Sequence, residues 1–115
     1  MILSLTAAAA LAALSPADEA DLHCIAIFAM SSSQNTEEKD AAGFVGAMMY
    51  YLGRVEGRSS AFDLESHLTR LLSDASYTQD KIQADATRCG TEMETRGAEL
   101  QKVGNALQRV GDAAK

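Results

Sequence analysis

The sequence predicts an all-α fold, a small bundle of about four helices with a long C-terminal helix. The composition favours helix, because the 115 residues include one Pro, no Trp and few other aromatics, whereas the good helix formers Ala, Leu, Met, Glu and Gln are abundant. Apolar residues also recur at helical spacing in four successive segments. Finally, Cys24 and Cys89 fall in the first and last of these segments, which predicts a disulfide that links the first and last helices.

The chain opens with a stretch that is typical of a signal peptide. Residues 2–14 are almost all Leu, Ile and Ala, a length that suits a secretory leader and is too short to span a membrane. Small residues at 15–17 then match a cleavage site, although no Lys or Arg precedes the apolar run. We expect a signal peptide over residues 1–17 and a periplasmic or secreted protein. The alternative is an Ala-rich core helix, because Ser15 and Pro16 also make a good helix start.

Residues 18–115 have the size of one domain. The formal net charge of −6 lies entirely in this part, so nucleic acid and anionic membrane surfaces are poor electrostatic partners. No stretch after the leader is long and apolar enough to cross a membrane. We therefore expect a single helical domain without nucleic-acid binding and without stable membrane insertion after leader removal.

The first two predicted helices differ in character. The first covers residues 18–30 and has an apolar face that includes Leu22 and Ile25. The second begins after Asn35 or Thr36, which can cap it, and runs to about residue 55. Its middle, residues 41–53, contains no charge. Because a helix without a polar face is normally surrounded by protein, we expect this second helix to be the central one.

The third and fourth helices follow a turn around residues 57–60. The third begins near Asp63 and fades at Ser76. The fourth begins at Thr78, and its apolar residues alternate steps of three and four in a heptad pattern: Ala86, Cys89, Met93, Leu100, Val103, Leu107 and Val110. A continuous helix to residue 113 would be about 54 Å long, longer than a domain of this size is wide. Its end must therefore project, bend back or pack on a second subunit.

Glycines recur every seven residues along the fourth helix, at Gly90, Gly97, Gly104 and Gly111. In a continuous helix they form a stripe beside the apolar residues, and such a stripe suggests close packing against another helix, including that of a second copy. The alternative is that some of them end a helix, with Gly90 as a C-cap. We favour a continuous helix, with a bend at Gly90 as one form of it.

The cysteine pair has several interpretations. In an oxidising compartment two cysteines allow one internal bridge, which would stabilise the fold by roughly 4 kcal/mol in the chain-entropy model. The alternatives are buried thiols, an intermolecular bridge or a metal site. A zinc site would need His23, Cys24, His67 and Cys89, whose spacings match no usual zinc motif. We expect a disulfide and no metal.

Signs of catalysis are sparse. The chain has no Gly-x-Ser-x-Gly, no P-loop, no dinucleotide-binding glycine motif and no His-Glu-x-x-His. His23 is next to Cys24, but adjacent residues of a helix point in different directions. His67 lies on the third helix, where we expect it to be half exposed. We therefore expect a protein that is not an enzyme and needs no cofactor.

A cluster near the end of the second helix is a candidate partner surface. Its members are Met48, Met49, Tyr50, Tyr51, Arg54 and Arg58. Met adapts to varied contacts, and Tyr and Arg are frequent in binding hot spots. The alternative is that most of the cluster is core and that the two arginines meet the helix dipole or an acidic ligand. The partner would be another protein or a second copy of this chain.

Two segments carry a resemblance. The residues Tyr-Tyr-Leu-Gly-Arg-x-x-Gly-Arg at 50–58 and Arg-Cys-Gly-x-Glu-Met at 88–93, with the leader and the first cysteine, resemble uncharacterised small exported two-cysteine helical proteins of proteobacteria. This resemblance implies no activity and no site residues. The chain is also loosely similar to acid-activated periplasmic chaperones, which are small, all-helical and held by one disulfide.

Three hypotheses for the function follow. The first is a non-enzymatic, exported interaction protein of the cell envelope. The second is a periplasmic acid or stress chaperone, which exposes apolar surface when its 16 carboxylates become protonated. The third is a carrier of a small ligand held in a pocket between helices.

Overall fold

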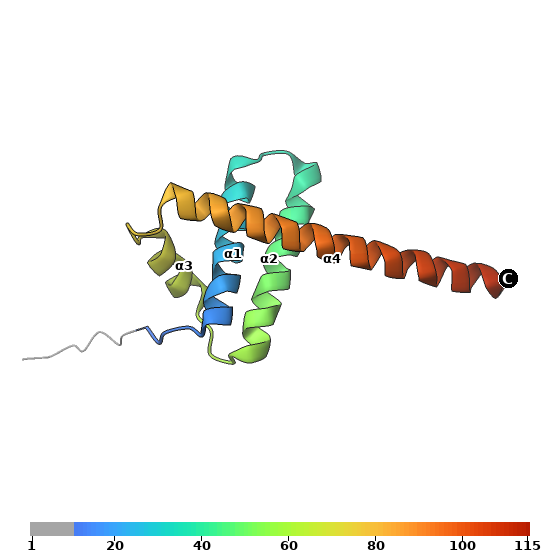
Figure 1. Cartoon of the computed structure of the whole chain (residues 1–115), viewed down its shortest axis with the longest axis horizontal. Helices are drawn as coiled ribbons and strands as arrows, with labels where there is room; N and C mark the ends of the chain where they lie inside the picture. Colours follow the sequence, from blue (N-terminus) through green and yellow to red (C-terminus); the bar gives the residue numbers. More distant parts are fainter. Residues whose placement is uncertain (1–10) are drawn as a thin grey trace, which may run out of the picture.

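The computed structural model describes residues 11–115 and confirms the all-α fold. In this part of the chain there are four helices and no strand: α1 (Pro16–Gln34), α2 (Glu38–Arg58), α3 (Leu64–Leu72) and α4 (Gln79–Ala113). Helices α1 and α2 pack side by side, and α4 crosses them and then projects far beyond them (Figure 1). Residues 1–10, most of the predicted leader, lie outside the described residues.

Helix α1 begins at the capping signal that the sequence contains. The Ser15 hydroxyl accepts a hydrogen bond from the backbone N–H of Asp18 at 3.1 Å, and Pro16 occupies the first helical position, where its missing N–H costs nothing. The helix also continues past its expected end at residue 30. There the hydroxyl groups of Ser31 and Ser33 donate to carbonyls of the preceding turn. The signal peptide over residues 1–17 remains a prediction; cleavage after Ala17 would remove this cap.

The central helix is α1, so the prediction that the second helix is central was wrong. Helix α1 packs against all three other helices and buries seven residues, whereas α2 buries three. The first half of α2 is largely exposed, including Ala41, Ala42 and Gly43. The absence of charge misled the prediction, because Ala and Gly carry little apolar surface and can face water at small cost.

Helix α3 closes one end of the bundle. Its N-cap is Asp63, as expected, and the carboxylate accepts from the backbone N–H of Ser66 at 3.2 Å. Leu71 is buried against α1. The expectation of a half-exposed His67 was wrong, because this side chain is buried and its ring stacks on Phe62 with 5.4 Å between the ring centroids.

The core consists of two small clusters. One contains Cys24, Ile25, Tyr51 and Cys89; the other contains Leu22, Ala26 and Leu71. The predicted disulfide between Cys24 and Cys89 is present in the first cluster, with 5.5 Å between the Cα atoms and both side chains fully buried. It fixes α4 to α1 at the point where the two helices cross.

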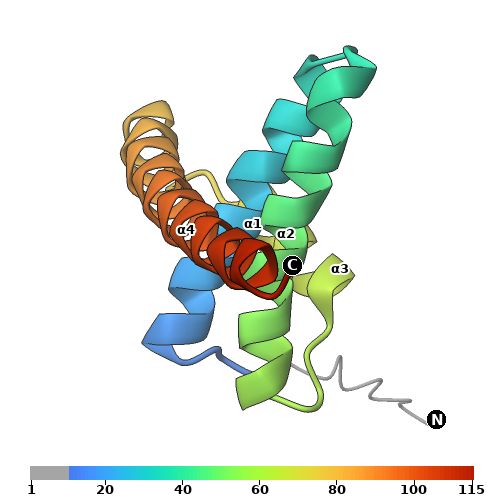
Figure 2. The same ribbon diagram turned by 90° about the vertical axis from the view of Figure 1, so that its right-hand side faces the viewer.

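Helix α4 is continuous through Gly90, as predicted, and its 35 residues correspond to about 52 Å. Figure 2 looks nearly along α4 and shows that it crosses α1 and α2 instead of running parallel with them. Within α4 only Cys89 is buried, and every residue from 94 to 115 is exposed. We call residues 11–93 the body and residues 94–115 the tail. No helix of the described residues combines the length and hydropathy that a membrane span requires.

Candidate interaction surface

The tail carries a row of exposed apolar side chains on one face. Leu100 is 71 % exposed, Val103 55 %, Leu107 65 % and Val110 66 %. They occupy successive a and d positions of the heptad pattern, which in a coiled coil face a partner helix. We call these four residues the apolar seam. Exposed apolar residues that are scattered singly need no explanation, but a continuous row along one helix face marks a binding surface.

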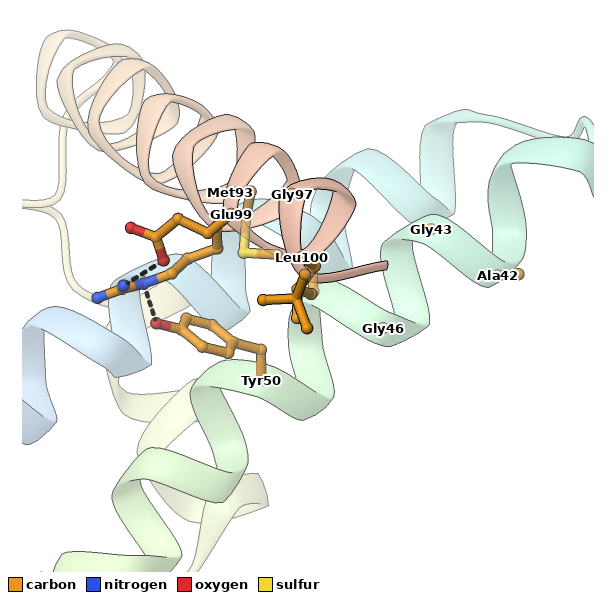
Figure 3. A pocket seen from close by; sticks show the side chains of 11 residues that line it. Ala42, Gly43, Gly46, Tyr50, Met93, Gly97, Glu99 and Leu100 are labelled. Atoms are coloured by element: carbon orange, nitrogen blue, oxygen red, sulfur yellow. Dashed lines mark hydrogen bonds and ion pairs between the residues drawn. The ribbon is translucent and has the colours of Figure 1, made fainter. Parts of the chain in front are cut away.

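At its body end the seam continues into a groove between α2 and α4, which we call the α2–α4 groove. The groove has a volume of about 620 Å³. Its residues on α2 are Ala42, Gly43, Gly46, Ala47 and Tyr50, and its residues on α4 are Met93, Arg96, Gly97, Glu99, Leu100 and Val103. Leu100 and Val103 therefore belong to both the groove and the seam. Figure 3 shows Tyr50 on α2 and Leu100 on α4 at this groove, with the Tyr50 hydroxyl directed toward a hydrogen-bond partner from α4.

One edge of the groove is polar. The Tyr50 hydroxyl accepts a hydrogen bond from Arg96 Nε at 3.1 Å, and Arg96 in turn contacts Glu99 at 2.8 Å (Figure 3). Arg96 occupies the one polar position within the heptad pattern. Because Glu99 neutralises its charge, the edge closes the groove without leaving an unpaired ion, and the rest of the lining is small or apolar.

The predicted partner surface on α2 separates into three groups. Tyr51 is fully buried, and Met48 and Tyr50 are partly buried against the same core cluster. Met49 is 66 % exposed and belongs to neither the core nor the groove lining. Burial raises the pKa of the Tyr51 hydroxyl well above its ordinary value, and hydrogen bonding and charge from Glu92 add to this. Of this cluster, only Tyr50 contributes to the groove.

The remaining two members, Arg54 and Arg58, bind carboxylates of their own chain. Arg58 contacts Asp18 at 2.7 Å and also Asp21, and Arg54 contacts Asp21 at 3.2 Å and Glu92 at 3.1 Å. Hydrogen bonds to Asp18 and Asp21 raise the pKa of Arg58 above its ordinary value. Because the Asp18 and Asp21 side chains are buried, these arginines satisfy the body's buried charges and tie α2 to α1 and α4.

The glycine stripe of α4 has no close neighbour among residues 11–115. A Cβ added at Gly90, Gly97, Gly104 or Gly111 would meet no other atom within 4 Å. Each glycine inside a helix costs about 1 kcal/mol relative to Ala, and packing within the described residues does not account for that cost. Gly97 forms part of the groove wall, and Gly104 follows Val103 of the seam in the sequence.

The structure also reveals a polar cluster that the sequence analysis missed. His23 Nδ1 lies 2.7 Å from Asp85 Oδ2, which also accepts from the Tyr77 hydroxyl at 2.8 Å, while Arg88 contacts the other carboxylate oxygen at 3.2 Å. Burial alone would raise the pKa of Asp85, but the hydrogen bonds from His23, Tyr77 and Arg88 outweigh it and lower this pKa. A separation of 62 residues between His23 and Asp85 leaves no local sequence signal for this pairing.

Comparison of the chain with known proteins and structures finds no match. The chain matches no protein-family model, no curated protein and no solved structure. The surface must therefore be interpreted from its own chemistry.

The groove and the seam are suited to apolar contact, because their lining is mostly small or apolar. Among residues 11–115 no group of three or more His, Cys, Asp or Glu side chains could hold a metal ion. Tyr77 and Arg88 donate hydrogen bonds to Asp85, and the contact between Asp85 and His23 joins α4 to α1. This cluster therefore has a structural role. The α2–α4 groove, with a volume of about 620 Å³, and the apolar seam that continues from it together form a mainly apolar surface on α2 and α4.

Proposed function

We propose that this chain is a non-enzymatic, exported interaction protein that binds an amphipathic helix of a partner protein. The observation that carries the proposal is the continuity of the α2–α4 groove with the apolar seam through Leu100 and Val103. A helix laid in a groove presents apolar residues at i, i+3, i+4 and i+7. The side chains of the apolar seam recur on α4 at this helical spacing, so they can face the apolar side of the bound helix.

The composition of the groove supports a helix as the ligand. Ala42, Gly43 and Gly46 on α2, and Gly97 on α4, line the groove, and small side chains let the axes of two helices come close together. Beyond the groove, Leu107 and Val110 extend the apolar contact along the tail. A bound helix could therefore contact the chain over several turns.

Two features support export. The apolar leader is one, and the Cys24–Cys89 disulfide is the other, because such bridges persist mainly in oxidising compartments outside the cytosol. A periplasmic or secreted location agrees with both.

Photo-crosslinking in the producing cell tests the proposal. Benzoylphenylalanine replaces Leu100 in one variant and Asn105 in the control, since Asn105 is exposed on the opposite face of the tail. We expect a discrete crosslinked protein from position 100 and none from position 105, with the adduct identified by mass spectrometry. Absence of any adduct at position 100, or equal adducts at both positions, would contradict the proposal.

A small-ligand carrier is the second candidate, because a groove of about 620 Å³ lies within the usual range of ligand pockets. A small ligand would cover Leu100 but leave Leu107 and Val110 exposed. A fluorescent apolar dye distinguishes the two functions: for a carrier, Leu107→Glu/Val110→Glu leaves dye binding unchanged. For a helix-binding surface, we expect the same variant to abolish the crosslink from position 100.

An acid-activated chaperone is the third candidate, and the buried Asp18 and Asp21 carboxylates favour it. The ion pairs of these two carboxylates hold α1 to α2, and loss of those pairs would loosen the body. Suppression of client aggregation between about pH 2 and 4 tests it. Absence of protection there would remove this candidate.

A further inference from the structure

We propose that the helix bound in the α2–α4 groove is the tail of a second copy of this chain, so that two copies form an antiparallel dimer through α4. The inference rests on the proposed function, because it names the partner for the same groove and seam. The charge distribution of α4 and of the body, the small residues that flank the seam and the self-complementarity of the seam favour this partner.

The charge changes sign along α4. Residues 79–99 include five acidic and three basic side chains, a formal charge of −2, whereas residues 100–115 include three basic and one acidic side chain, a formal charge of +2. In an antiparallel pair the basic end of each tail lies beside the acidic part of the other α4. In a parallel pair, like charges would lie side by side. Charge complementarity therefore favours a second copy in the antiparallel orientation.

The body strengthens this preference. Residues 11–93 contain 13 acidic and six basic side chains, a formal charge of −7, and the tail contains four basic and three acidic side chains, a formal charge of +1. An antiparallel pair directs each basic tail end toward the acidic body of the other copy and keeps the two bodies at opposite ends of the joined helices. A parallel pair would bring two bodies of charge −7 together.

The residues beside the seam suit close helix packing. With Leu100 and Leu107 at a positions, the e positions are Gly97, Gly104 and Gly111, and the g positions after Glu99 are Ala106 and Ala113. Charged e and g residues usually set the partner and orientation of a coiled coil. Here small residues replace them, so two α4 helices can approach closely. This approach gives the glycine stripe a packing role that no contact within the chain provides.

The seam is also self-complementary. A dimer with twofold symmetry uses the same patch on both copies. Leu100 and Val103 line the groove, and Leu107 and Val110 project beyond it. In the antiparallel pair the projecting residues of each tail reach the groove of the other copy, so both halves of the apolar surface are covered by the same contact.

Sedimentation equilibrium of the purified, disulfide-bonded protein tests the dimer. We expect twice the mass of the purified chain at micromolar concentration for the natural sequence. Leu100→Glu/Leu107→Glu should raise the dissociation constant at least 100-fold and give the monomer mass. The matched control Gln101→Glu/Gln108→Glu adds the same charge at b positions, outside the seam and its flanking residues, and should remain dimeric. Circular dichroism and a thiol assay verify that each variant keeps its helices and its disulfide.

A charge-reversal pair tests the orientation. Arg109→Glu/Lys115→Glu should weaken the dimer about tenfold at low salt, and the effect should fade at high salt because screening shortens the range of exposed charges. Adding Glu94→Lys should restore part of the affinity, because in the antiparallel pair the reversed charge at residue 115 of each copy then lies near a reversed charge at residue 94 of the other. Absence of this rescue would overturn the antiparallel arrangement.

The two proposals fail in different ways. A monomeric natural sequence at all concentrations up to millimolar, or a dimer that Leu100→Glu/Leu107→Glu leaves intact, overturns the second copy as the occupant. If position 100 then still crosslinks to a different protein, the proposed function stands and only its partner changes. A monomer without any crosslinked protein overturns both.

Discussion

The body and the tail are held by different kinds of contact. The body has one disulfide, two core clusters and ion pairs that join separate helices, such as Arg58 with Asp18. In the tail, among the described residues, the ion pairs are local to α4 or its end, Arg96 with Glu99 and Lys115 with Asp112, and all side chains are exposed. Folding energy is therefore concentrated in the body, and uncovered apolar surface is concentrated in the tail.

This difference separates stability from binding. Most helical stability in proteins comes from tertiary packing, and Gly97, Gly104 and Gly111 lower the helix propensity of the tail, so the tail is helical mainly because the body nucleates it. Substitutions in the body should therefore unfold the protein. Substitutions in the tail should change what it binds and leave the free energy of unfolding nearly unchanged.

Removal of the disulfide should produce the largest effect. We expect Cys24→Ala/Cys89→Ala to lower the free energy of unfolding by about 4 kcal/mol, because the bridge constrains a long loop in the unfolded chain. Urea denaturation followed by circular dichroism measures it. Truncation after Gly97 is the control from the tail. It should leave the free energy of unfolding within about 0.5 kcal/mol of that of the monomeric full-length chain. An equal loss from truncation would mean that body and tail form one folding unit.

The next largest effect should come from the ion pairs that join α1 to α2. Asp21→Ala leaves Arg54 and Arg58 without their shared carboxylate. Breaking a fully buried pair costs about 3–5 kcal/mol, but these arginines are about one-third exposed and can be rehydrated. We therefore expect a loss of about 2 kcal/mol. The matched tail variant, Asp112→Ala, should cost less than about 0.5 kcal/mol, and thermal unfolding compares the two.

The sequence is sufficient for the local features of the fold. The side chains of Ser15 and Asp63 cap α1 and α3 close to the predicted helix starts, because capping depends on residues within one turn. The cap predicted for α2 at Asn35 or Thr36 was wrong, since Glu37 occupies that position. The heptad pattern likewise predicted a continuous α4 and placed Cys89 facing α1. These signals report the period and the ends of a helix, which are local properties.

The global features required the structure. Lack of charge in residues 41–53 indicated burial, yet the exposure of this segment depends on where α4 crosses α2. The same crossing brings His23 to Asp85 and forms the groove at Tyr50. For Arg54 and Arg58 the sequence predicted a partner surface, the helix dipole or an acidic ligand, and not carboxylates of the same chain, because Asp18 and Asp21 lie on another helix. Helix crossings are set by the sum of many contacts, and no short motif encodes them.

Acid should weaken the body through Asp85. Its pKa is lowered in the folded state from about 3.9 in an unfolded chain. A lowered folded pKa gives stability that is present above the unfolded pKa and is lost as the pH falls through the folded pKa. We therefore expect Asp85→Asn to be less stable than the natural protein at pH 7, and the difference to shrink below about pH 4.

Chemical denaturation of both proteins between pH 2 and 7 measures that difference. Asp112→Asn in the tail is the control, since Asp112 is exposed and contacts only Lys115. Its stability should follow the natural protein at every pH. A pH-independent difference for Asp85→Asn would show that its hydrogen bonds, and not its charge, stabilise the crossing of α1 and α4.

The smallest expected effect is also the most direct test of the boundary between body and tail. Gly90 and Gly104 both have room for a Cβ, so replacement by Ala should gain helix propensity of up to about 1 kcal/mol at either position. In the body this gain adds to global stability, so Gly90→Ala should raise the urea midpoint. In the tail the gain goes into helix that frays before the body unfolds. Gly104→Ala should therefore increase helicity without moving the midpoint.

Both variants are best compared in the Leu100→Glu/Leu107→Glu background, because that background keeps two copies apart and removes any contribution from self-association. Hydrogen exchange locates the change: slower exchange at residues 98–110 is expected for Gly104→Ala, and slower exchange throughout the body for Gly90→Ala. Equal shifts of the urea midpoint from both variants would show that cooperative unfolding extends through the tail. The tail would then be part of the folded unit, and substitutions in it would change stability as well as binding.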